Sequence, residues 1–149
     1  FANGRDVSSE IRSVRVTEES RFVAGNQLVR DLLVDLQRKI ACNRDIVTEG
    51  RDQGTVAFPQ AECKFFLTAD PEERARRRHA ELRQRGESID LDTLVTQIVD
   101  RDRRDAERKV GALRPAEDAI VIDTSKITTE AMIGELEQRV RQNRSRPAQ

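Results

Sequence analysis

Short apolar runs that alternate with helical patterns constrain the fold of this chain more than any other feature. Residues 63–67 and 119–123 are almost wholly apolar, as strands are when helices cover both faces of their sheet. Residues 46–49 predict a further short strand, which ends at Gly50. Strands that alternate with helices favour an α/β fold built around a parallel sheet.

The segments around these runs carry helical periodicity. Apolar residues recur at helical spacing between residues 17 and 40, which predicts helix there. Asp70 followed by Pro71 is typical of a helix start, and we expect that helix to run to about Gly86. Further helices are predicted from residue 90 to just before Gly111, and from residue 128 to about residue 144.

The first six residues predict the end of a strand and a turn. Asn3-Gly4 is a strong hairpin signal, yet the sequence opens on Phe1, in the middle of that hairpin. A natural chain seldom starts there, so we expect this sequence to be truncated at its N-terminus.

Charge and composition exclude several classes of protein. The 27 basic and 27 acidic residues balance, so the chain has no general attraction to nucleic acid or to an anionic membrane. An arginine-rich RNA-binding domain is a weaker alternative, because there is no Trp or Tyr to stack on bases. No apolar stretch approaches the roughly 20 residues of a membrane span. Two cysteines without metal-ligand spacing favour the reduced cytoplasm.

Two segments place arginine beside aspartate where a ligand is expected. Gly50-Arg51-Asp52 follows a predicted strand, and ligands of parallel α/β folds bind beyond the carboxyl ends of the strands. The segment can equally be a turn held by its own Arg–Asp pair. On the predicted helix before Gly111, three arginines share a face with Asp105, which suits a phosphate, although such a face is commonly only solvated. These arginines are Arg101, Arg104 and Arg108.

A second arginine cluster lies on the helix that precedes Gly86. Arg77 and Arg78 stand in its middle, among further arginines between residues 74 and 85. Arginines on a helix before a glycine-containing loop suit a lid that closes over phosphates, whereas a solvated helix is the more common explanation. His79, the single histidine, has no evident acid–base partner in the sequence.

Taken together, these motifs resemble those of the bacterial-type cytidylate kinases over essentially the whole chain. The resemblance implies an α/β, parallel-sheet P-loop nucleoside monophosphate kinase fold, here truncated at its N-terminus, with an arginine-rich helical lid. The motifs that carry it are Glu49-Gly50-Arg51-Asp52-x-Gly54-Thr55, Glu72-Glu73-Arg74-Ala75 and Arg101-Asp102-x-Arg104-Asp105-x-x-Arg108. The implied parts are a remnant of the monophosphate-binding insert (1–15), a helix and core strands with the Arg51 loop (16–70), the lid (71–90), and core helices with the last strand (91–149).

The resemblance also implies a reaction, in which ATP with Mg²⁺ donates its γ-phosphoryl group to CMP or dCMP. Arg30 and Asp52 would then bind cytosine, because a carboxylate accepts from the amino group at N4 and a guanidinium donates to N3 and O2. The remaining implied roles are CMP phosphate binding by Arg51 and Arg108, ribose binding by Asp105 with Arg101 orienting it, and contact with the transferred phosphates by Arg77, Arg78 and Arg104.

One family motif does not occur in these residues. G-x-x-x-x-G-K-S/T, the loop that holds ATP, is absent from the 149 residues, so we expect this fragment alone to be inactive. The alternative is a non-catalytic nucleotide-binding or interaction module that has lost the loop. We expect the intact protein to be a monomer, and the truncated form to be prone to self-association through exposed sheet edges.

Overall fold

The computed structural model divides the chain into two compact units, Phe1–Val47 and Thr48–Gln149. It describes residues 1–108 and 111–144, apart from the side chains of Arg12, Val14, Thr17, Glu18, Arg21 and Ala24. None of the helices within these residues is long and apolar enough to cross a membrane.

The first unit opens with a tight turn and continues in helices. Asn3 and Gly4 both have positive φ, 49° and 81°, and backbone hydrogen bonds of 2.8 and 3.0 Å join Ala2 and Arg5 across them. The predicted hairpin turn is therefore confirmed, because Asn-Gly is the pair that adopts two left-handed residues most readily. A short 3₁₀ turn, η1 (Glu10–Arg12), leads into the helices α1 (Val14–Ala24) and α2 (Gln27–Ala41).

The helical pattern predicted between residues 17 and 40 corresponds to these two helices, separated at Gly25 and Asn26. The Asn26 side chain accepts a hydrogen bond from the backbone N–H of Val29 at 3.3 Å, which caps the first turn of α2. Apolar side chains of α2 are exposed, among them Leu28 at 81% and Leu32 at 68%.

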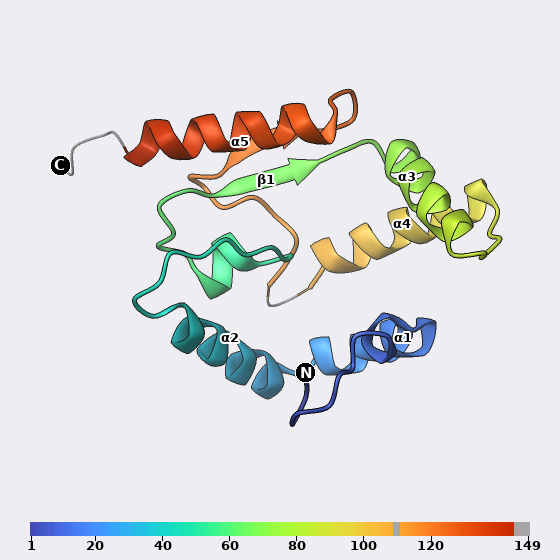
Figure 1. The fold of residues 1–149 in the computed structure, drawn as a ribbon, viewed down its shortest axis with the longest axis horizontal. Helices are drawn as coiled ribbons and strands as arrows, with labels where there is room; N and C mark the ends of the chain where they lie inside the picture. The colour runs from blue at the N-terminus through green and yellow to red at the C-terminus, as the bar shows by residue number, and fades with distance from the viewer. Residues whose placement is uncertain (109–110, 145–149) are drawn as a thin grey trace. The chain divides into compact units, whose positions relative to one another are not determined.

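The second unit contains a parallel pair of strands, which confirms the predicted α/β class. β1 (Phe65–Thr68) pairs with β2 (Ile120–Asp123), with Phe65 opposite Ile120 and Thr68 opposite Asp123. The remaining elements of this unit, drawn in Figure 1, are the π-helical turn η2 (Gln53–Ala57), α3 (Pro71–Gln84), α4 (Leu91–Ala106) and α5 (Thr129–Arg144).

The strand predicted at residues 46–49 is wrong. This stretch has no regular structure, and Ile46 and Val47 are exposed, at 44% and 104%. A strand is defined by a hydrogen-bonded neighbour, and within the described residues β1 and β2 pair only with each other. The local apolar pattern alone is therefore not sufficient to make a strand, because it does not supply a pairing partner.

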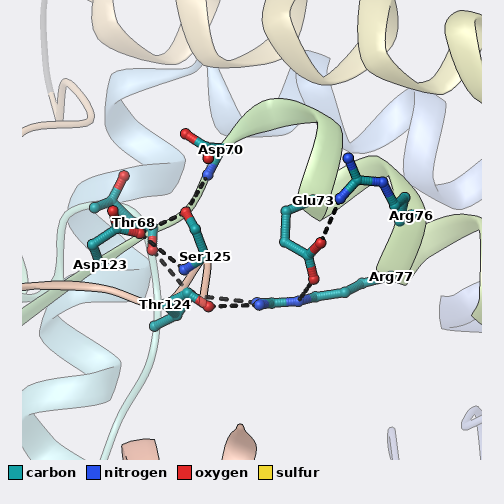
Figure 2. A network of polar contacts seen from close by, with 8 residues as sticks. All are labelled: Thr68, Asp70, Glu73, Arg76, Arg77, Asp123, Thr124 and Ser125. Carbon is teal, nitrogen blue, oxygen red and sulfur yellow. Dashed lines mark hydrogen bonds and ion pairs between the residues drawn. The ribbon is translucent and has the colours of Figure 1, made fainter. Parts of the chain in front are cut away.

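Polar side chains join the carboxyl ends of the two strands to the start of α3 (Figure 2). The Thr124 backbone N–H and hydroxyl both donate to the carbonyl of Thr68, at 2.7 and 3.0 Å. The Ser125 hydroxyl accepts from the Asp70 N–H at 2.8 Å and donates to the Asp123 carboxylate at 2.6 Å. Helix α3 therefore begins at a fixed position beside the ends of β1 and β2.

Helices α3 and α4 pack against each other around a small apolar core. Ala75 and Leu82 of α3 and Leu94 of α4 are 0%, 5% and 4% exposed. Partly buried residues surround them, namely Ile89, Leu91, Val95 and Ile98. The Asp90 carboxylate accepts from the Thr93 N–H at 3.0 Å, so α4 begins with a side-chain cap after the Gly86 loop. The predicted starts of both helices are confirmed.

Lys64 anchors the segment before β1 to the segment before β2. Its ammonium group donates to both carboxylate oxygens of Asp118, at 2.8 and 2.6 Å, and to the carbonyl of Pro59 at 2.5 Å. The Lys64 side chain is 8% exposed and that of Asp118 65%. The hydrogen bond from Lys64 is the main cause that lowers the pKa of Asp118 below its ordinary value.

Replacing Leu94 by Ala should destabilise the second unit, because the truncation leaves a cavity between α3 and α4. We expect the free energy of unfolding to fall by about 2–4 kcal/mol, measured by urea unfolding followed by circular dichroism. Val99→Ala, on the same helix but 47% exposed, is the control and should change it by less than about 0.5 kcal/mol. Equal effects of the two substitutions would contradict the packing described.

Replacing Asp118 by Asn should make the free energy of unfolding less dependent on pH in the acid range. Because the folded-state pKa of Asp118 lies below its unfolded value, its stabilising effect is present above the unfolded pKa and lost as the pH falls through the folded pKa. We therefore expect wild type and Asp118→Asn to differ in urea midpoint at about pH 6 and to converge below about pH 4. Glu117→Gln controls for the loss of a neighbouring charge. A difference that persists unchanged in acid would contradict the Lys64–Asp118 contact.

Candidate functional site

A buried carboxylate surrounded by arginines forms the centre of the candidate site. Asp105, near the end of α4, is 2% exposed. Nη2 of Arg108 lies 2.6 Å from its Oδ1, and Nη1 of Arg51 lies 3.1 Å from its Oδ2. Nε of Arg101 lies 3.8 Å from the same Oδ2. The structure therefore brings together four of the residues that the sequence singled out: Arg51 from the loop before η2, Arg101 and Asp105 from α4, and Arg108 from the segment after it. Helix α4 ends at Ala106, earlier than the predicted end just before Gly111.

The arginines leave both positive charge and an unsatisfied acceptor at this site. Three guanidinium groups face a single carboxylate, so the cluster carries an excess of cations. Oδ2 of Asp105 is buried and has no hydrogen-bond partner among the described residues, although two arginine nitrogens lie near it. A buried acceptor without a hydrogen bond is costly, and a donor from a ligand would satisfy it.

The electrostatics of Arg101 reflect this crowding of cations. Partial removal from water lowers the pKa of Arg101, and the neighbouring charge of Arg51 lowers it further. Asp105 acts in the opposite direction, but it does not fully offset these effects. An anion bound among the arginines would relieve their mutual repulsion.

The loop that presents Arg51 and Asp52 is held by its own backbone. The Asp52 carbonyl accepts from the N–H groups of Val56 and Ala57, at 2.8 and 3.2 Å, which forms the π-helical turn η2. A Cβ atom at Gly50 would lie 2.9 Å from the Gln53 side chain. A larger residue at position 50 would therefore require the Gln53 side chain to turn away.

The sequence analysis missed a second ion pair beside the site. Arg74 of α3 contacts the Asp102 carboxylate of α4 through both terminal nitrogens, Nη1 to Oδ2 and Nη2 to Oδ1 at 3.2 Å. Oδ1 of Asp102 also lies 3.7 Å from Nη1 of Arg51. A signal was present, because Asp102 precedes Asp105 by three positions and therefore lies on the same side of the helix.

Arg77 and Arg78 lie on α3, and Arg104 on α4. Arg77 donates to the carbonyl of Thr124 at 2.6 Å and to Glu73 at 3.0 Å (Figure 2). Arg78 contacts Glu81 at 3.4 Å, and Arg104 donates to the Asp100 carbonyl at 3.0 Å. Among the described residues none of the three forms an ion pair with Asp105, so the structure does not gather their guanidinium groups into the cluster.

The two residues expected to bind the base belong to different units. Asp52 is half-buried at the start of η2 in the second unit, and Arg30 is half-buried on α2 in the first. The position of Arg30 relative to Asp52 is therefore not defined.

A hollow of about 370 Å³ lies beside Arg77, at the carboxyl end of β2. Thr124, Thr128 and Met132 line it together with Arg77. In the described part of the chain, no three His, Cys, Asp or Glu side chains gather in a way that could hold a metal ion.

The chain is similar to known proteins over nearly its whole length. Residues 1–142 match the family model described as cytidylate kinase. A cytidylate kinase of Geobacter sp. (strain M21) is 45% identical over 142 residues, which make up 95% of this chain and 61% of that protein. The cytidylate kinase of Pelotomaculum thermopropionicum is 49% identical over 133 residues, 89% of this chain and 59% of the relative.

A third relative gives the same result. The cytidylate kinase of Rhodopirellula baltica is 44% identical over 142 residues, 95% of this chain and 62% of that protein. The chain thus spans about three fifths of the length of these curated relatives. With a family match that covers nearly all of its residues and identities of 44–49% to these relatives, the chain belongs to the cytidylate kinase family.

Proposed function

We propose that the protein containing this chain transfers the γ-phosphoryl group of ATP to CMP or dCMP, giving ADP and CDP or dCDP. The observation that carries the proposal is the buried Asp105 with its unsatisfied Oδ2, set among three arginines. This combination offers an acceptor for a sugar hydroxyl beside donors for a phosphate, as a nucleoside monophosphate requires.

Arg51 and Arg108 bind the phosphate of CMP in this proposal. Each side chain is 31% exposed, so both are partly withdrawn from water yet reachable by a ligand. The planar guanidinium binds two phosphate oxygens at once, which gives arginine an advantage over lysine in such a site. The excess of cations over carboxylates supplies the charge that neutralises a phosphate dianion.

Asp105 accepts hydrogen bonds from the ribose hydroxyls, and Arg101 orients the carboxylate. The 2% exposure of Asp105 makes such a hydrogen bond strong, because little water competes for the acceptor. Binding of dCMP in place of CMP removes one of the two hydroxyls, so the same carboxylate also influences the choice between the two substrates.

Asp52 and Arg30 recognise cytosine. Asp52 accepts from the amino group at N4, and Arg30 donates to N3 and O2. Uracil presents the opposite pattern at N3 and C4, so it would leave a desolvated polar group unpaired, at a cost of about 1–3 kcal/mol. This cost is the proposed basis for preferring CMP over UMP.

Arg77, Arg78 and Arg104 neutralise the phosphates during transfer, with residues 71–90 acting as a lid. When bound, ATP with Mg²⁺ supplies the phosphoryl group and spreads its charge over the metal. In kinases Mg²⁺ is usually bound through the substrate phosphates together with one or two carboxylates. The task of the protein is alignment and charge neutralisation, and arginines perform both.

Calorimetric titration of the chain with CMP, and with UMP and AMP at the same salt concentration, tests the proposal. We expect selective binding of CMP. Asp105→Asn should weaken CMP binding by about 10- to 100-fold, because a hydrogen bond to a charged group contributes about 1.5–3 kcal/mol. Asn keeps the shape of the buried side chain, and circular dichroism checks that the variant is folded.

Asp100→Asn provides the matched control on the same helix. The Asp100 carboxylate contacts Arg103 and is 48% exposed, so this substitution should leave CMP affinity unchanged. Absence of CMP binding in the wild-type chain, or equal losses in the two variants, would contradict the assigned site. In the whole protein, formation of ADP from ATP must depend on added CMP or dCMP.

A further inference from the structure

Arg51 lies between two carboxylates, and only one of them is buried. Its Nη1 is 3.1 Å from Oδ2 of Asp105 and 3.7 Å from Oδ1 of Asp102. Both contacts use the same nitrogen, so within the described residues Nε and Nη2 of Arg51 have no ion-pair partner. Those two nitrogens form the edge that a phosphate would bind.

Asp102 is held away from Arg51 by a stronger partner. Arg74 donates hydrogen bonds to both oxygens of the Asp102 carboxylate, and the bond from Nη2 to Oδ1 is 3.2 Å long. Arg51 approaches only one of these oxygens. A two-point contact is stronger and better oriented than a single longer one. The side chains of Arg74 and Asp102 are 34% and 29% exposed, so water screens the pair only in part.

The packing of the two helices fixes this arrangement. Arg74 precedes the fully buried Ala75 of α3, and Asp102 lies on α4, whose Leu94 is packed in the same apolar core. The Arg74 guanidinium is therefore presented to Asp102 by the helix pair, and not by a mobile loop. Without that guanidinium, Asp102 would need to move by less than about 1 Å to form a full hydrogen bond with Arg51.

We propose that Arg74 is a positioning residue for the phosphate site, which acts by holding Asp102 so that the carboxylate does not move closer to Nη1 of Arg51 and neutralise the charge that attracts phosphate. The inference rests on the proposed function, since it takes Arg51 as a phosphate ligand. It links α3, the proposed lid helix, to the site on α4: when Arg74 is in place, Arg51 is available, and when Arg74 is removed, Asp102 neutralises Arg51.

A simpler explanation makes a different prediction. If Arg74 contributed only its positive charge, replacing it would weaken phosphate binding by the same factor whether or not Asp102 is ionisable. If Arg74 acts through Asp102, the effect must disappear once the carboxylate is gone. A double-mutant cycle separates the two cases, because it measures the coupling between the residues directly.

The experiment titrates CMP, and cytidine as a ligand without phosphate, into the wild-type chain, Arg74→Gln, Asp102→Asn and the double variant at one salt concentration. We expect Arg74→Gln to weaken CMP binding about fivefold to tenfold and to leave cytidine binding unchanged. In the double variant, CMP affinity should return to within about twofold of Asp102→Asn alone. Arg74→Lys keeps the charge but not the planar guanidinium, so its CMP affinity should lie between those of wild type and Arg74→Gln. It replaces Arg74→Gln in the experiment if that variant does not fold.

The pair Arg103–Asp100, at 3.0 Å on the same helix, provides the matched control. Arg103→Gln and Asp100→Asn should not change CMP affinity, singly or together. An equal loss from Arg74→Gln in both backgrounds would overturn the inference in favour of charge alone. A parallel loss of cytidine binding would show a merely structural role. If the wild-type chain binds CMP and Arg74→Gln binds it equally well, only this inference is overturned. If the wild-type chain does not bind CMP, the proposed function is overturned as well.

Discussion

The charge of Asp105 cannot be buried unless cations accompany it, and much of the second unit is arranged around that requirement. At 2% exposure the carboxylate has lost nearly all contact with water, and removal of a partner from a buried ion pair costs about 3–5 kcal/mol. Arg108 lies two positions after the end of the helix that carries Asp105, but Arg51 comes from a loop more than fifty positions earlier in the chain. Asp105 therefore ties the loop before η2 to the end of α4.

Helix α3 connects this cluster to the ends of the strands. Arg74 and Arg77 are separated by three positions, yet they contact different elements: Arg74 pairs with Asp102 of α4, and Arg77 donates to Thr124, directly after β2. Thr124 in turn is bonded to Thr68, at the end of β1. Since one rigid helix carries both arginines, a movement of α3 would alter both sets of contacts together.

Particular residues show which structural features local sequence patterns can predict. The turn at Asn3 and Gly4, the start of α4 after Asp90 and the parallel class of the sheet were all predictable, because each depends on backbone preferences or on burial of neighbouring side chains. The strand predicted at 46–49 failed because pairing needs a distant partner. The proximity of Arg101 to Asp105 followed from helical spacing within α4, but helical spacing does not account for Arg108, which lies beyond the end of the helix, or for Arg51.

Local patterns in the sequence were sufficient to predict the class of fold, the starts of α3, α4 and α5, and the family, because apolar periodicity, capping residues and motif order are local properties of the chain. Only the tertiary structure decided which charges meet. Arg74 and Asp102 stand 28 positions apart, and their contact depends on the packing of Ala75, Leu82 and Leu94 between α3 and α4. Distances of a few ångströms across that packed core decide which arginine pairs with a given carboxylate. Before the core forms, the sequence alone does not distinguish the arginines of α3 from one another.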